Sequence, residues 1–299
     1  MRISHRFSKS KTVIIISIFL IITFLFNGCS ILFRTKVGQL TTTTEVPIYY
    51  EEKGEGEPVI LLHGVMVNSD LNWKLPKVYQ KLAKDNRVIA VDLRGHGFSG
   101  KPRGLENYGI KLVEDIVDLM NELNIEKAHI VGYSLGGFIA LKFATTYPER
   151  AYSVVIAGAG WEKSTPQNLE RLKKITNALR EYQDCTPLLE LVGMRNEGLQ
   201  RIAIWIANVY YRKTNDFQSI ADLLDSVPEL EVSEDSLKKC SLPVLIIAGT
   251  NDPLCDTADE LATVLPNGKL IWIYNGTHMN TIFKKQFCEA IMSHLTNHK

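Results

Sequence analysis

The sequence predicts an α/β fold in which a mostly parallel central sheet is flanked by helices and carries an inserted helical cap. Short, uniformly apolar runs recur along the chain, as buried parallel strands do. Helical patterns separate several of these runs, and this alternation is typical of a parallel sheet. The alternation stops over residues 161–240, where only helix-like segments follow one another. That stretch is therefore predicted to be a cap inserted into the α/β core.

The apolar runs give the predicted strands in order along the chain. A first strand is expected over residues 46–52, ending before Gly54 and Gly56, which indicate a turn. The buried parallel strands are expected at 58–62, 87–91, 128–132, 153–157, 243–248 and 269–274. We expect the fold proper to begin near residue 38.

A helix between two of these strands shows the pattern most clearly. Its apolar residues recur at helical spacing and predict one buried face. These residues are Leu112, Ile116, Leu119, Met120 and Leu123. The acidic residues between them are expected to face water, namely Glu114, Asp115, Asp118 and Glu122.

Composition excludes some classes of partner. The chain has 299 residues, of which 45% are hydrophobic and 22% charged, as in an ordinary globular protein. Its 34 basic and 33 acidic residues leave a net charge of +1. No strong field exists to recruit a polyanion, so no nucleic-acid partner is expected.

The first 28 residues have the shape of a membrane-targeting leader. Basic residues precede an apolar stretch at 13–26. A stretch of about fourteen residues suits a signal peptide better than the roughly 20 residues that span a bilayer. The residues before Cys29 resemble the lipobox of bacterial lipoproteins, in which the leader is cut before a lipid-carrying cysteine. This resemblance implies a lipidated Cys29, a tether over residues 29–37 and a domain held at the extracytoplasmic face of a membrane.

Two other interpretations of the leader remain open. It is also compatible with a signal anchor that is never cleaved, or with a secretory peptide and an unmodified Cys29. Both still place the domain outside the cytosol. Four further cysteines, Cys185, Cys240, Cys255 and Cys288, would permit disulfides in an oxidising compartment. Their spacing does not choose a pairing and gives no zinc pattern, and we expect buried free thiols.

Ser134 lies in a pattern typical of a catalytic nucleophile. Residues 132–137 read Gly-Tyr-Ser-Leu-Gly-Gly, after the strand expected at 128–132 and before a helical run at 138–145. A serine on such a strand–turn–helix elbow exposes its hydroxyl above the sheet. Side chains at positions 132 and 136 would collide with the neighbouring strand and helix, which explains both glycines. The alternative is a glycine-rich turn capped by a serine.

A serine needs a base and an orienting carboxylate, because its hydroxyl is a poor nucleophile by itself. Asp252 follows the strand expected at 243–248, and His278 follows the last strand. The chain order Ser134, Asp252, His278 is that of the hydrolases that use this elbow. The alternatives are a helix N-cap for Asp252 and a turn histidine for His278.

Backbone N–H groups near the elbow are expected to bind a developing oxyanion. We assign them to Val65, in the loop after the strand at 58–62, and to Leu135, directly after the nucleophile. His63 precedes this loop and is expected to brace it. Residues 92–99 contain two glycines but lack the lysine and hydroxyl residue of a phosphate loop. His96 in that segment is expected to brace a turn.

With these motifs together, the chain resembles the α/β-hydrolase superfamily from about residue 38 to the C-terminus. The best match is the capped group of esterases, C–C bond hydrolases, lactonases, epoxide hydrolases and dehalogenases. The resemblance implies a core over residues 38–160 and 241–299, with the cap at 161–240. Epoxide hydrolases and dehalogenases of this group carry an aspartate nucleophile, whereas position 134 is serine.

The expected function is therefore hydrolysis of a small or medium acyl ester by a serine esterase of the carboxylesterase type. No cofactor or metal is implied. A C–C bond hydrolase, a ligand-binding or signalling protein on the same scaffold, and cofactor-free oxygen or peroxide chemistry are the alternatives. Trp161, Trp205, Tyr210 and Tyr211 are candidate walls of the substrate pocket, although large aromatics are more often core.

Overall fold

The computed structural model describes residues 38–42 and 44–298 of the chain. The leader predicted at residues 1–28, the tether at 29–37 and the lipidation site at Cys29 lie outside these residues. Among the helices of the described part of the chain, none combines the length and apolar character needed to cross a membrane.

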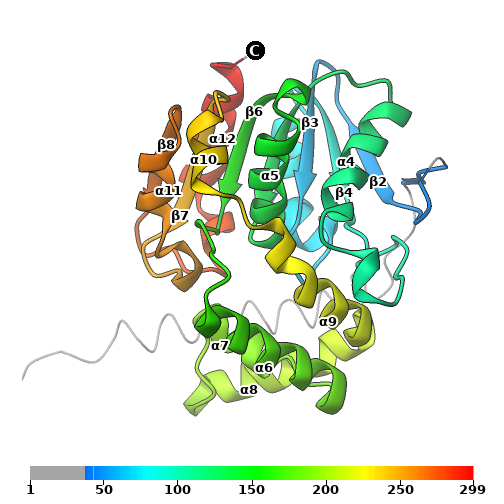
Figure 1. The fold of residues 1–299 in the computed structure, drawn as a ribbon, viewed down its shortest axis with the longest axis vertical. Helices are drawn as coiled ribbons and strands as arrows, with labels where there is room; N and C mark the ends of the chain where they lie inside the picture. The colour runs from blue at the N-terminus through cyan, green and yellow to red at the C-terminus, as the bar shows by residue number, and fades with distance from the viewer. Residues whose placement is uncertain (1–37, 43, 299) are drawn as a thin grey trace, which may run out of the picture.

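Eight strands form one sheet in the order β1-β2-β4-β3-β5-β6-β7-β8 (Figure 1). The neighbouring strands from β4 through β8 run parallel to one another. At one edge of the sheet, β2 pairs antiparallel with β4, and β1 pairs antiparallel with β2. The predicted α/β fold with a mostly parallel sheet is thus confirmed. The strands are β1 (Gln39–Leu40), β2 (Tyr49–Lys53), β3 (Glu57–Leu62), β4 (Asn86–Val91), β5 (Ala128–Tyr133), β6 (Ala151–Ala157), β7 (Val244–Gly249) and β8 (Gly268–Ile273).

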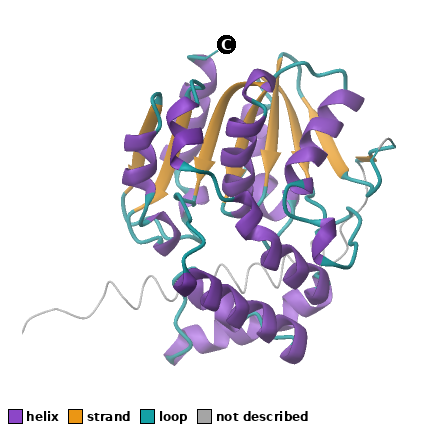
Figure 2. Cartoon of the chain, viewed as in Figure 1, coloured by secondary structure: helices purple, strands orange, loops and turns teal. Residues whose placement is uncertain are grey.

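Central strands are apolar on both faces because helices cover both (Figure 2). Every residue of β5 and of β7 is buried. The last strand, β8, is different, since three of its six residues are only partly buried and two, Lys269 and Trp272, are exposed. Its expected burial was therefore wrong, because β8 pairs with β7 alone at the edge of the sheet.

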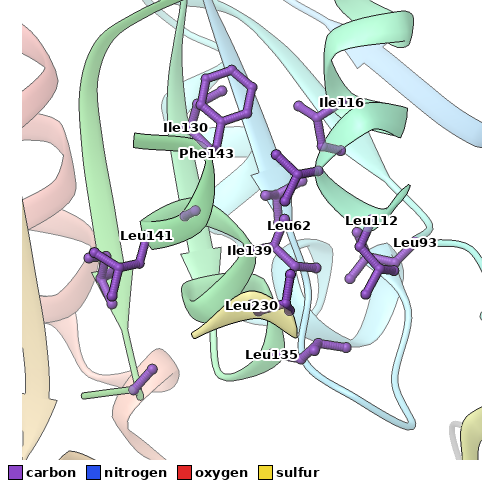
Figure 3. Packing of buried hydrophobic residues seen from close by; sticks show 14 of the residues in the cluster. Leu62, Leu93, Leu112, Ile116, Ile130, Leu135, Ile139, Leu141, Phe143 and Leu230 are labelled. Carbon is purple, nitrogen blue, oxygen red and sulfur yellow. The ribbon is translucent and has the colours of Figure 1, made fainter. Parts of the chain in front are cut away.

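Helices lie in two layers around the sheet, and two hydrophobic clusters fill the space beneath them. Helices α4, α5, α10 and α11 pack on one face, while α3 and α12 pack on the other (Figure 1). In the first cluster, side chains of α4 and α5 meet strand residues such as Leu62 and Ile130 (Figure 3). The helices of the core are α3 (Val78–Leu82), α4 (Lys111–Glu122), α5 (Leu135–Thr146), α11 (Ala258–Val264) and α12 (Lys285–Thr296), and α10 (Glu234–Lys239) leads into β7.

Helix α4 shows the expected apolar face, but one acidic residue departs from the prediction. Asp115 is buried rather than facing water. It accepts hydrogen bonds from the guanidinium of Arg94, one of them from Nε at 2.6 Å, and Arg94 also donates to the carbonyl of Asn107. The helical pattern alone could not show this, because the cation arrives from a distant loop. Burial raises the pKa of Asp115, and the adjacent Arg94 opposes that rise.

Only helices lie between β6 and β7 (Figures 1 and 2). The strand arrows point toward this group, so the carboxyl ends of the parallel strands face it (Figure 1). An ion pair between Arg180 of α6 and Asp222 of α9, at 2.8 Å, ties two of these helices together. They are α6 (Pro166–Tyr182), α7 (Thr186–Leu191), α8 (Gly198–Thr214) and α9 (Phe217–Ser226), followed by the short turn η4 (Val227–Leu230) and by α10, which packs on the sheet.

Four cysteines in the described part of the chain are buried free thiols, as expected from their spacing. They are Cys185, Cys240, Cys255 and Cys288. Burial raises the pKa of each thiol, to about 12 for Cys185, so these groups stay protonated at neutral pH.

Candidate active site

Ser134 occupies the sharp turn between β5 and α5. Its backbone φ is 55°, in the left-handed region that non-glycine residues rarely adopt. The two flanking glycines make this turn possible. A Cβ on Gly132 would lie 1.9 Å from the carbonyl oxygen of Gly136, and one on Gly136 would lie 2.2 Å from that of Leu62. The turn is thus built from close backbone contacts that leave room for hydrogen atoms only.

The structure brings Ser134, His278 and Asp252 together from the ends of three different strands. Nε2 of His278 lies 3.0 Å from Oγ of Ser134. Nδ1 of His278 lies 3.0 Å and 3.1 Å from the two carboxylate oxygens of Asp252. These contacts suit a tautomer in which Nδ1–H donates to Asp252 and Nε2 accepts the serine proton. All three residues are buried.

Asp252 also begins a short turn, η5 (Pro253–Cys255), because its Oδ1 accepts a hydrogen bond from the N–H of Leu254 at 3.1 Å. The alternative role considered for this residue, a helix cap, is therefore present beside its contact with His278. The two roles are compatible, since a carboxylate offers several lone pairs. The cap fixes the carboxylate where His278 meets it.

A further contact holds His278 in place and was not foreseen from the sequence. The hydroxyl of Tyr133 donates to the backbone carbonyl of His278 at 2.6 Å. Tyr133 is the residue before the nucleophile, and its ring also lies against the imidazole, with centroids 5.4 Å apart. Burial raises the pKa of Tyr133 well above its ordinary value, so the hydroxyl remains a donor. The elbow and the loop carrying the histidine are thereby linked directly.

Val65 and Leu135 both line the cavity beside Ser134. In the described part of the chain, neither backbone N–H is seen to donate to a protein acceptor. Leu135 is the first residue of α5, whose early N–H groups have no partner within the helix. Both amides are therefore free to receive an oxygen atom of a bound molecule.

Two buried histidines hold the loop that carries Val65. His63 bonds the carbonyl of Gly64 through Nδ1 and accepts from the N–H of Leu93 at 3.0 Å. His96 accepts from the N–H of Met66 at 3.1 Å through Nε2. Burial, assisted by nearby His63, lowers the pKa of His96 to about 3, so it stays neutral and keeps Nε2 as an acceptor. Both histidines brace turns, as their sequence positions indicated.

A cavity opens from Ser134 into the space beneath the cap. Its empty volume, which includes the solvent-filled mouth, is about 1030 Å³. Most of its exposed lining is apolar. The apolar lining comes from α5, α6, α7 and the segment around η4, and includes Phe138, Leu141, Leu172, Ile175, Leu188, Leu191 and Leu230.

The two cations of the cavity wall, Lys163 and Arg171, both face carboxylates. Arg171 lies 3.3 Å from the carboxylate of Glu162, and Lys163 lies 2.8 Å from that of Glu260. Oε2 of Glu231 accepts a hydrogen bond from the N–H of Ser164. Among the described residues that line this wall, each cation therefore has a carboxylate partner. The sequence did not single out this polar group, because its members lie in the cap without a motif.

Of the four aromatic residues predicted to line the substrate pocket, one lines the cavity. Trp161 lines the cavity, and its Nε1–H donates to the carbonyl of Val232 at 2.9 Å. Trp205 is largely exposed. Tyr210 and Tyr211 meet edge to face, with ring centroids 5.5 Å apart, and do not line the cavity. Within the described residues, no group of three or more His, Cys, Asp or Glu is arranged to hold a metal ion.

Comparison with known proteins agrees with this architecture. The sequence profile of the family described as alpha/beta hydrolase fold matches residues 57–285. The chain is 27% identical over 268 residues to a pimeloyl-(acyl-carrier protein) methyl ester esterase of Aliivibrio fischeri, covering 84% of this chain and 98% of that protein. It is 32% identical over 129 residues to a 2-hydroxy-6-oxo-2,4-heptadienoate hydrolase of Pseudomonas putida, covering 42% of this chain and 46% of that protein.

Among solved structures, a thermophilic esterase from Thermogutta terrifontis is similar, with a TM-score of 0.73 at 23% identity, over 87% of this chain and 98% of that one. At that identity the likeness shows the fold. The family profile spans most of the described residues, from β3 to the start of α12. The chain therefore belongs to the α/β-hydrolase fold family, whose relatives here include esterases and C–C bond hydrolases.

Proposed function

We propose that the protein is a serine hydrolase that cleaves a small or medium, uncharged acyl ester. The observation that carries this proposal is the chain of contacts from Ser134 through His278 to Asp252, at 3.0 Å and 3.0 Å. A base within hydrogen-bond distance of the serine and a carboxylate that orients this base are the two requirements for activating the nucleophile.

The reaction then follows from the positions of these groups. Oγ of Ser134 attacks the ester carbonyl while Nε2 of His278 takes its proton, and Asp252 stabilises the resulting imidazolium. The N–H groups of Val65 and Leu135 bind the oxyanion, each supplying about 3–4 kcal/mol of transition-state stabilisation. His278 returns the proton to the leaving alcohol. Water, activated by the same histidine, then releases the acid from Ser134.

An uncharged acyl chain fits the cavity better than an anion does. Most of the exposed lining of the cavity is apolar, and burying an acyl chain there gains about 0.8 kcal/mol for each methylene. Both cations of the wall, Lys163 and Arg171, already face carboxylates. A substrate carboxylate would have to displace one of these partners, which removes the gain from the new pair.

Cleavage of a C–C bond is the second candidate, favoured by the similarity to the heptadienoate hydrolase over 42% of the chain. The same serine, histidine and aspartate can serve both reactions. The substrate in that protein's name is a carboxylate, however, and the paired charges in this cavity offer it no free cation. We therefore place ester hydrolysis first.

The experiment is a comparison of hydrolysis rates for p-nitrophenyl esters of increasing acyl length. We expect wild type to turn over repeatedly, with kcat/KM rising from acetate toward medium chains, and the Ser134→Ala variant to lose at least about 10⁴-fold in kcat. A dienoate with a cleavable C–C bond serves as the competing substrate. Turnover of the dienoate without turnover of any ester would replace the proposal by the second candidate. Single-turnover hydrolysis alone would favour a ligand-binding role.

We also propose that the leader attaches the domain to the outer side of a membrane through Cys29. The support is the sequence alone, namely the apolar stretch at 13–26 followed by Cys29. Acyl chains on this residue would anchor stably when more than one is present. Replacing Cys29 with Ala should release the protein from the membrane fraction. Unchanged retention would instead indicate an uncleaved signal anchor.

A further inference from the structure

The outer face of α8 carries apolar side chains that the fold leaves in solvent. Leu199, Ile202, Trp205 and Val209 are 48%, 52%, 67% and 38% exposed. Their spacing of three to four residues places them along one side of the helix. A surface helix of a soluble domain normally turns polar residues outward. We call these four residues the α8 stripe.

The opposite side of α8 packs against the rest of the cap. The α8 stripe is therefore not the side of the helix that the fold buries. Ala203, Ile204 and Asn208 are buried against the rest of the cap. Oδ1 of Asn208 accepts from the N–H of Cys185 at 2.8 Å, and its Nδ2 donates to Oγ1 of Thr186 at 3.0 Å. These bonds attach α8 to the start of α7 and fix which side faces out.

The charge of α8 has one sign. Gly198–Thr214 contains the basic residues Arg201, Arg212 and Lys213 and no acidic residue. All three basic residues are exposed. The nearest acidic residue before the helix, Glu197, lies 3.7 Å from Arg195. An apolar face that includes a tryptophan, bordered by cations, is the pattern of a helix that lies in a membrane interface.

Helix length agrees with this orientation. Seventeen residues make a helix of roughly 25 Å, which is shorter than a bilayer core of about 30 Å. With its three cations, α8 suits a position along the membrane surface. Figure 1 shows α8 at the lower end of the molecule, on the far side of the cap from the sheet. The stripe can therefore meet a flat surface.

We propose that the α8 stripe binds the surface of an anionic phospholipid bilayer, with Trp205 entering the boundary between headgroups and acyl chains and the three cations meeting lipid phosphates. A second copy of the chain fits the same face less well. Two stripes meeting across a twofold axis would bring Arg201, Arg212 and Lys213 of each copy toward like charges, which is repulsive. Anionic lipids complement these cations instead.

The test uses the full chain and measures quenching of tryptophan fluorescence by brominated acyl chains in phosphatidylglycerol vesicles. Trp205→Gln is compared with Trp272→Gln, the matched control, because Trp272 is an exposed tryptophan on β8 at the sheet edge. We expect strong quenching in wild type and in Trp272→Gln, and loss of most of it in Trp205→Gln. The leader is the same in every variant, so the difference reports α8 alone.

The same quenching measurement tests whether lipid charge and the three cations of α8 contribute to binding. Pure phosphatidylcholine vesicles, and the variant R201Q/R212Q/K213Q in phosphatidylglycerol, should both lower Trp205 quenching to a similar level. Absence of quenching in wild type, or equal quenching in Trp205→Gln, would overturn the proposal. Quenching that is the same in both kinds of vesicle and in the variant R201Q/R212Q/K213Q would overturn the proposed role of the three cations. A dimer seen by sedimentation without vesicles, lost in I202S/V209S and accompanied by no quenching, would assign the stripe to a second copy.

Discussion

At the scale of residues, Asp252 shows how one side chain orients a site. Its carboxylate meets Nδ1 of His278 and also accepts from the N–H of Leu254. Replacing Asp252 with asparagine removes the negative charge but keeps the shape of the side chain. The substitution therefore tests how Asp252 orients His278 without changing the packing around it. The amide of an asparagine can present its NH₂ to Nδ1, which would favour the wrong tautomer of the histidine.

Asp252→Asn should therefore lower kcat by about 10⁴-fold while leaving the folded structure intact. The measurement is steady-state hydrolysis of a p-nitrophenyl ester, together with the thermal midpoint. Asp256→Asn is the matched control, because Asp256 is an exposed aspartate four residues further on. Equal loss in both variants would show that Asp252 does not act through His278.

Most of the candidate site could be predicted from single residues in their motifs. Ser134, Asp252 and His278 each follow a recognisable apolar strand, and the carboxyl ends of parallel strands meet at one edge of the sheet. The hydroxyl of Tyr133 could not be assigned this way, because its acceptor is the backbone carbonyl of a residue 145 positions away. Burial of Asp115 was missed for the same reason.

At the scale of elements, the elbow between β5 and α5 depends on backbone contacts. A Cβ on Gly136 would lie 2.2 Å from the carbonyl oxygen of Leu62. Because the clashing atom belongs to the backbone, only a shift of the main chain could relieve this contact. At Gly137 the nearest atom is the Cβ of Ala159 at 3.0 Å, a smaller conflict. These two adjacent glycines allow a direct comparison.

Gly136→Ala should destabilise the fold by about 3 kcal/mol and sharply reduce ester hydrolysis, because α5 must move away from β3. Gly137→Ala should be clearly milder. Urea unfolding gives the free energy of unfolding for each variant. A Gly136→Ala protein as stable and active as wild type would refute the close packing of this elbow.

The cap helix α6 is expected to limit acyl length. Leu172 and Leu169 both line the cavity, but Leu169 is 41% exposed and lies toward solvent, whereas Leu172 packs against the core cluster. A large side chain at the inner position would fill the space that a longer acyl chain occupies. The outer position should tolerate the same change.

Leu172→Trp should therefore reduce kcat/KM for octanoate by about 10- to 100-fold, as expected for loss of roughly two to three buried methylenes. Acetate hydrolysis should change little. Leu169→Trp is the control and should leave the ratio of octanoate to acetate nearly unaltered. Equal effects of both variants on both esters would place the acyl chain elsewhere.

The strands were predictable as elements because buried parallel strands have a strong apolar signal, and β3 to β8 agree with the expected ranges to within two residues. The residues that line the cavity could not be predicted in the same way. Which face of a cap helix turns inward depends on its packing against the core, so Trp161 and Trp205 looked alike in sequence yet lie in opposite environments.

At the scale of the whole molecule, buried neutral histidines link stability to pH. Burial lowers the pKa of His294 to about 4 and that of His96 to about 3. Burial is the main reason that a proton on His294 is disfavoured, and nearby His298 and His129 add to it, while a hydrogen bond with the backbone of Pro243 opposes it only in part. In the unfolded chain both groups titrate near 6.5. The unfolded state therefore binds more protons below that pH, and stability is lost as pH falls.

For His294 the lost stability should be on the order of 3 kcal/mol between pH 6.5 and pH 4, from about 1.4 kcal/mol for each pKa unit. His294→Gln removes this titration, so its free energy of unfolding should fall less steeply over that range. Urea unfolding at several pH values gives the slopes. Parallel slopes for variant and wild type would show that His294 is not held neutral by the fold.

In the proposed reaction, the substrate acylates Ser134 while His278 acts as the base. The most direct measurement is peptide mass spectrometry after reaction with a fluorophosphonate, which labels an activated serine, performed on wild type and on His278→Ala. We expect one phosphonate on Ser134 in wild type and almost none in His278→Ala. Ester hydrolysis by wild type should fall in proportion to the fraction of Ser134 that is labelled. Labelling at another residue, or full ester hydrolysis with Ser134 labelled, would contradict the proposed reaction.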